Sequence, residues 1–131
     1  MARETKYRAW DTELSVMHHA VECGVDTGVQ WSFGDLLISS RFSLVMQFTG
    51  LRDKNGKEIY EGDVLQYKDV AYSFDTEDEI MVEVVRWGDE QAAWMLVCPW
   101  SGEMQTAWDG VDPKKSEVIG NIHENPELIE Q

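Results

Sequence analysis

Apolar and polar residues alternate along short segments of the chain, which is the pattern of half-buried β-strands. The clearest segment is residues 80–87, where both faces are mostly apolar, so we expect this strand in the centre of a sheet. Shorter segments of the same kind predict strands at residues 6–11, 29–33, 44–49, 64–67, 93–98 and 117–122, with a weaker one at 15–20. Strands at this spacing predict a mainly β protein, either a small barrel or a curled antiparallel sheet.

Turn and capping residues separate these segments. Asn55-Gly56 predicts a tight hairpin turn, because both residues tolerate positive φ angles, and Gly34-Asp35 and Gly62-Asp63 mark further turns. Near the C-terminus, Asn125-Pro126-Glu127 places a capping residue, a proline at the first helical position and an acid in sequence. This order predicts a short helix over residues 126–130. Residues 12–28, 69–79 and 99–115 show little periodicity and predict loops.

Three blocks of the chain share one pattern with a known family. Residues 6–11 are KYRAWD, residues 47–64 are QFTGLRDKNGKEIYEGDV, and residues 118–128 are VIGNIHENPEL. In order and placement these blocks resemble the YopX family of small phage and prophage proteins. The resemblance implies an SH3-like barrel over residues 62–122 and a gene carried by a phage or prophage. It implies no reaction and assigns no catalytic residue.

The chain length fits one compact unit, because 131 residues are enough to bury a hydrophobic core. Within this unit we expect two regions. Residues 1–61 form an N-terminal β region that contains the Asn-Gly turn, and residues 62–131 form the SH3-like barrel with a C-terminal helical turn.

The chain is strongly acidic, with 11 basic and 25 acidic side chains and a formal net charge of −14. Lys114-Lys115 is an adjacent basic pair, and Asp112 and Glu117 flank it, so we expect no direct binding of duplex nucleic acid. No apolar run approaches the roughly 20 residues that cross a bilayer, and the charged N-terminus does not resemble a signal peptide. We therefore expect no membrane attachment and a cytoplasmic location in the bacterial host. The acidity itself fits plain solubility, a surface that imitates DNA or docks on a basic partner, or a cation-binding surface.

The sequence contains no pattern typical of a metal site or a catalytic centre. His18, His19 and Cys23 give the spacing His-His-x3-Cys, but no second pair follows to complete four zinc ligands. The nucleophile elbow, the phosphate loop and the dinucleotide fingerprint are all missing from the sequence. We expect no metal, no cofactor and no enzymatic activity.

Five residues are candidates for binding. Tyr60, Glu61 and Asp63 surround the Gly62 turn, where they either line a groove or hold the turn through hydrogen bonds to the backbone. Trp100 and Trp108 lie in the irregular segment 99–115 and form either a recognition surface or a small satellite core.

These observations favour a phage or prophage accessory protein that binds a host or phage protein without catalysis. The alternative is an inhibitor of a host defence system, either an acidic DNA mimic or a protein that sequesters a nucleotide. A nucleotide-binding pocket would need an arginine for the phosphate; the candidates are Arg8, Arg41, Arg52 and Arg86. Exposed strand edges also allow a homo-oligomer.

Overall fold

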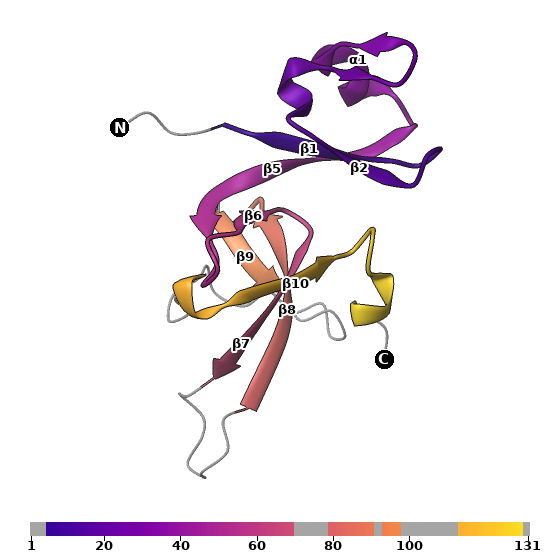
Figure 1. Ribbon diagram of the computed structural model, residues 1–131. Helices are drawn as coiled ribbons and strands as arrows, with labels where there is room; N and C mark the ends of the chain where they lie inside the picture. Colours follow the sequence, from indigo (N-terminus) through magenta and orange to yellow (C-terminus); the bar gives the residue numbers. More distant parts are fainter. Residues whose placement is uncertain (1–4, 70–78, 91–92, 98–112, 130–131) are drawn as a thin grey trace. The chain divides into compact units, whose positions relative to one another are not determined.

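The computed structural model describes residues 5–69, 79–90, 93–97 and 113–129 (Figure 1). It is mainly β, with curled antiparallel sheets and a short helical turn at the C-terminus, which confirms the predicted fold class. The chain forms two compact units, Met1–Gly50 and Leu51–Gln131. The sequence had suggested a division at residues 61 and 62, whereas here residues 51–61 belong with the second unit. In the described part of the chain, no helix has the length and apolar character needed to span a membrane.

The first unit contains an antiparallel sheet with a small helical layer against it (Figure 1). The sheet has the order β2-β1-β5-β6, in which β1 is Tyr7–Asp11, β2 is Val16–His19 and β5 is Phe42–Arg52; the last strand, β6 (Glu58–Tyr60), belongs to the second unit. Strand β5 is longer than the predicted 44–49 and continues into the second unit. The connection from β2 to β5 contains the 3-10 turn η1 (Val21–Cys23), the strands β3 (Val25–Asp26) and β4 (Gln30–Trp31), and the helix α1 (Phe33–Ile38).

Helix α1 corrects the sequence prediction at this point. Residues 29–33 were expected to be one strand followed by a Gly34-Asp35 turn, but the strand ends at Trp31. The Ser32 hydroxyl accepts a hydrogen bond from the Asp35 N–H at 3.2 Å, and the Asp35 carboxylate accepts one from the Ser32 N–H at 3.2 Å. This reciprocal capping box satisfies two backbone donors and starts a helix where the alternation of side chains suggested a strand.

The core of the first unit lies between the sheet and the segment that connects β2 to β5. Leu36 of α1 is fully buried, while its neighbours Leu37 and Ile38 are exposed. One packed cluster of buried apolar side chains joins the sheet, η1, β3 and α1; its members are Ala9, Val21, Val25, Leu36 and Phe42. A helix of six residues is not stable by itself, so α1 depends on packing, and Leu36 is its buried residue.

The second unit contains a four-stranded antiparallel sheet of order β10-β7-β8-β9. Its strands are β7 (Asp63–Asp69), β8 (Glu79–Gly88), β9 (Ala93–Val97) and β10 (Glu117–Asn121). The interior position of β8 confirms the central strand expected from residues 80–87. The short strand β6 (Glu58–Tyr60) follows the Asn-Gly turn, and the 3-10 turns η2 (Pro113–Lys115) and η3 (Pro126–Ile129) flank β10.

One packed cluster in the core of the second unit takes one residue from each of the strands β6 to β10. These residues are Ile59, Leu65, Val85, Leu96 and Val118. Trp87 and Trp94 face each other across the β8–β9 hairpin with ring centroids 5.1 Å apart, in an edge-to-face arrangement. Trp87 is exposed, whereas Trp94 packs against the core.

Candidate binding surface

The predicted groove residues lie at the turn between β6 and β7. Tyr60 and Asp63 are buried, and Glu61 is half-buried. The Asp63 carboxylate accepts a hydrogen bond from the backbone N–H of Tyr60 at 2.7 Å, which fits the turn-holding alternative. A groove at these residues stays a prediction, and Trp100 and Trp108 lie outside the described residues.

Asp53, which belongs with Asp63 to the block of residues 47–64, also accepts hydrogen bonds from the backbone. Asp53 is buried, and its carboxylate accepts hydrogen bonds from the N–H groups of Asn55 at 2.8 Å, Lys57 at 2.9 Å and Val118 at 2.9 Å. Burial alone raises the pKa of Asp53, but the three N–H donors outweigh it and lower the pKa. Asp53 therefore ties the Asn-Gly turn to β10.

The histidines and the cysteine do not form a cluster. His18 lies beside Asp11, whereas His19 and Cys23 are exposed. Within residues 5–69, 79–90, 93–97 and 113–129, no three His, Cys, Asp or Glu side chains are placed to hold a metal ion.

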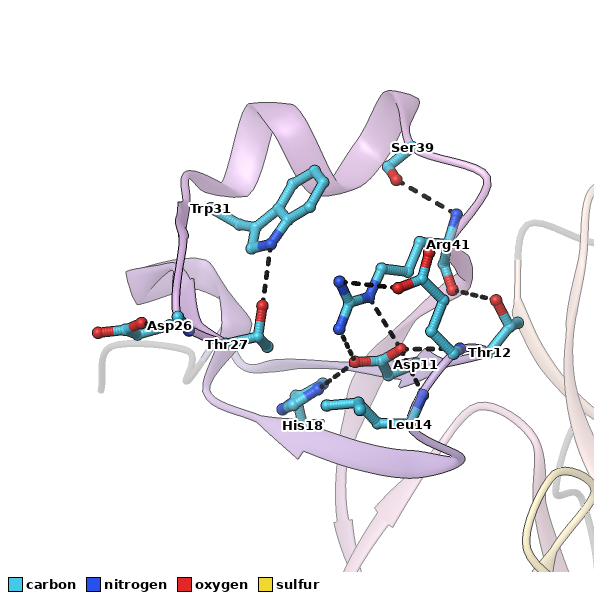
Figure 2. A network of polar contacts seen from close by, with 11 residues as sticks. Asp11, Thr12, Leu14, His18, Asp26, Thr27, Trp31, Ser39 and Arg41 are labelled. Atoms are coloured by element: carbon cyan, nitrogen blue, oxygen red, sulfur yellow. Dashed lines mark hydrogen bonds and ion pairs between the residues drawn. The ribbon is translucent and has the colours of Figure 1, made fainter.

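The densest polar network of the first unit surrounds Asp11, at the end of β1 (Figure 2). The fully buried carboxylate accepts two hydrogen bonds from Arg41, from Nε and Nη2, both at 3.0 Å. His18 Nε2 lies 3.0 Å from the same carboxylate, and the N–H groups of Glu13 and Leu14 donate to it at 3.0 and 3.1 Å. The Arg41 guanidinium holds the pKa of Asp11 well below its usual range, against the opposing effect of burial.

Arg41 connects this network to Trp31. Its guanidinium carbon lies 5.9 Å from the Trp31 ring centroid and 5.6 Å from that of Phe42, within the range of a cation–π contact. The Trp31 indole N–H donates to the Thr27 hydroxyl at 3.2 Å, as Figure 2 shows. The Trp31 and Phe42 rings are 5.4 Å apart in an edge-to-face arrangement. Asp11 thus positions Arg41, and Arg41 with Thr27 and Phe42 positions Trp31.

Trp31 lines two open hollows on the surface of the first unit. The first, which we call the acidic hollow, has a volume of about 430 Å³. Its lining combines two aromatic rings with two carboxylates: Trp31, Phe33, Glu22 and Asp35. The second, the apolar hollow, has a volume of about 420 Å³, and its apolar lining comes from Val29, Trp31 and Ile38.

Large apolar side chains are exposed at the apolar hollow, where Val29 and Ile38 line it, and at Leu37 of α1. Val29 is 69% exposed, Leu37 58% and Ile38 87%, and we call these three residues the apolar patch. Sequence reasoning missed this patch because residues 29–33 were assigned to a strand. The signal was present in Ser32 and Asp35, three residues apart, followed by Leu36-Leu37-Ile38.

The fold and the sequence together define the family. The family described as "YopX protein" matches residues 6–130, so the chain belongs to the YopX family, as the three blocks suggested. Among solved structures, protein EF1440 from Enterococcus faecalis is similar, with 26% identity and a TM-score of 0.58, covering 98% of this chain and 100% of that chain. Protein yopX from Bacillus subtilis is similar in fold, with 24% identity, a TM-score of 0.56 and 96% of each chain covered. No curated protein matches the chain.

Proposed function

We propose that this protein is a non-catalytic module that binds a partner protein through the apolar patch of its first unit. The observation that carries the proposal is the exposure of three large apolar side chains: Val29 and Ile38, which line the apolar hollow, and Leu37, which precedes Ile38 in α1. An exposed apolar cluster beside a hollow is typical of a protein-binding surface, because leaving it in water costs free energy that a partner recovers.

The charge around the patch favours a protein partner over a phosphate-bearing ligand. Residues 9–40 contain five acidic side chains and no lysine or arginine. None of the arginines that the structure describes lines either of the two hollows. Among the arginines considered for a nucleotide, Arg8 is buried and Arg41 is bound to Asp11 and Glu13. These contacts give no support to the nucleotide-sequestering alternative.

The family context supports the remaining parts of the proposal. We place the protein among phage and prophage accessory proteins that act in the cytoplasm of a bacterial host, on the strength of the YopX resemblance. In this role the binding surface, and no catalytic group, is the functional part of the chain.

The test compares two double variants of the tagged full chain in lysate from the bacterial host. Leu37→Ser with Ile38→Ser removes the apolar patch from α1. The control, Leu14→Ser with Val16→Ser, removes two other exposed apolar side chains of the same unit. We expect one protein, identified by mass spectrometry, to be retained by the wild type and the control and reduced at least about tenfold by the patch variant.

The interaction is then measured with that partner purified. Equal retention by both double variants would overturn the proposal, and so would the failure of the wild type to retain any protein above background. Circular dichroism spectra of all three proteins show whether each variant is folded.

A further inference from the structure

We infer that the acidic hollow receives an arginine side chain of the partner protein, placed next to the apolar residue that covers the patch. This inference rests on the proposed function and names the chemistry of the partner. The two hollows share Trp31 and Asp35, so one continuous segment of a partner reaches both.

The lining of the acidic hollow is suited to a guanidinium group. Trp31 and Phe33 present aromatic rings, on which a planar cation stacks favourably. Glu22 and Asp35 supply carboxylate oxygens, which accept the paired N–H bonds of an arginine. The same protein already shows this chemistry at Arg41, whose guanidinium binds a carboxylate and lies against Trp31.

Glu22 provides an independent reason to expect a cation. Its Oε2 atom is buried and has no hydrogen-bond partner among the residues that the structure describes. A buried carboxylate oxygen without a donor costs free energy, so a Glu22 side chain that turns toward a cationic donor in the hollow removes that cost. Glu22 lies in η1, on the wall of the acidic hollow.

The surrounding charge supports the same occupant. The first lysine or arginine after Arg8 in the sequence is Arg41. Glu22, Asp26 and Asp35, all acidic, are the charged side chains of residues 20–40. Arg41, which lies near Trp31, is paired with Asp11 and Glu13, and the lining residues of the acidic hollow include no lysine or arginine. A cationic partner group therefore meets a negative field here, which also speeds its approach at low salt.

The test is a titration of the ¹⁵N-labelled full chain with Nα-acetyl-arginine methylamide, followed by NMR. The matched ligand is Nα-acetyl-citrulline methylamide, which has nearly the same shape and no charge. We expect the arginine compound alone to shift the amide signals of residues 22–24 and 30–35 and the Trp31 indole signal. We expect Glu22→Gln to weaken this binding about fivefold, as for one partly exposed charge pair.

Asp26→Asn is the control variant, because it removes the same charge from an exposed carboxylate that does not line the hollow. It should leave the affinity for the arginine compound within about a factor of two. Glu22→Gln is not expected to unfold the unit, since an amide costs less to bury than an unpaired carboxylate.

Several results would overturn the inference. They are the absence of shifts with the arginine compound, equal shifts with the citrulline compound, equal binding of the corresponding lysine compound, or equal losses in Glu22→Gln and Asp26→Asn. If the partner protein depends on Leu37 and Ile38 while the arginine compound does not bind, the inference fails and the proposed function stands. If the compound binds but no partner depends on the apolar patch, the proposed function fails instead.

Discussion

Asp11→Asn should destabilise the first unit by about 2–4 kcal/mol, because it breaks the network that positions Trp31. The asparagine oxygen can still accept from the backbone N–H groups of Glu13 and Leu14. Its NH₂ group, however, replaces the oxygen that accepts from Arg41 Nη2 at 3.0 Å and lies 3.0 Å from His18 Nε2. One charge-assisted bond worth about 1.5–3 kcal/mol is lost, and two donors then face each other in a buried position.

Urea unfolding followed by NMR measures this effect unit by unit. The indole N–H signals of Trp10 and Trp31 report on the first unit, and those of Trp87 and Trp94 report on the second. For a urea dependence of about 2 kcal/mol per molar, the midpoint of the first unit should fall by about 1–2 M. The Trp31 signal should also shift in the absence of urea, because Arg41 no longer holds its position.

Asp26→Asn is the control for this prediction. Asp26 is exposed, and its carboxylate accepts one local hydrogen bond, from the Gly28 N–H at 2.9 Å. Its unfolding free energy should lie within about 0.5 kcal/mol of that of the wild type. If Asp11→Asn unfolds at the same urea concentration as Asp26→Asn, the buried ion pair does not support the first unit and the reasoning is refuted.

Three further predictions concern pH and the backbone. The pKa of Asp11 in the folded protein lies below its unfolded value of about 3.9. The ionised Asp11 carboxylate therefore stabilises the first unit fully above that value, and this stabilisation is lost as the pH falls through the folded pKa. The urea midpoints at pH 6 and pH 3 should differ more in the wild type than in Asp11→Asn. Asp53→Ala leaves three N–H groups without their acceptor and should lower the unfolding free energy of the second unit by about 3 kcal/mol. The control Asp89→Ala, at an exposed residue, should change it by less than about 0.5 kcal/mol. Equal urea midpoints for the two variants would contradict this prediction. Gly24 and Gly28 both have positive φ angles, but of the two only Gly24 would place a Cβ against a backbone oxygen, that of Trp31 at 2.6 Å. Gly24→Ala should therefore lower the thermal midpoint clearly more than Gly28→Ala. An equal decrease of the thermal midpoint in both variants would contradict the placement of Gly24 against the β3–β4 hairpin.

The strands of the second unit could be predicted because local pattern and final packing agree there. Residues 80–87 are apolar on both faces, and β8 is an interior strand with Val84 and Val85 both buried. Asn125 and Pro126 marked the start of the C-terminal turn, which is a 3-10 helix from Pro126 to Ile129.

The polar network behind the candidate surface could not be predicted, because it joins residues that are distant in the sequence. Asp11 and Arg41 are thirty positions apart, and their pairing exists only once β1 and β5 are adjacent. The helix that exposes Leu37 and Ile38 begins through the capping box of Ser32 and Asp35, whereas the alternation around Trp31 favoured a strand. The capping residues over 32–35 predict a helix, whereas the alternation over residues 29–33 predicts a strand. The helix is the one that forms, and it buries Leu36 in the core.

The most direct test of the binding surface is photo-crosslinking at position 38. The probe is Ile38→p-benzoylphenylalanine, and the matched probe replaces Leu14, which is also exposed and lies outside both hollows. We predict that the probe at position 38 forms a covalent adduct with the partner protein, that the probe at position 14 does not, and that Glu22→Gln reduces the adduct. Equal adducts at both positions, or an adduct at position 14 alone, would contradict the assignment of the apolar patch as the binding surface.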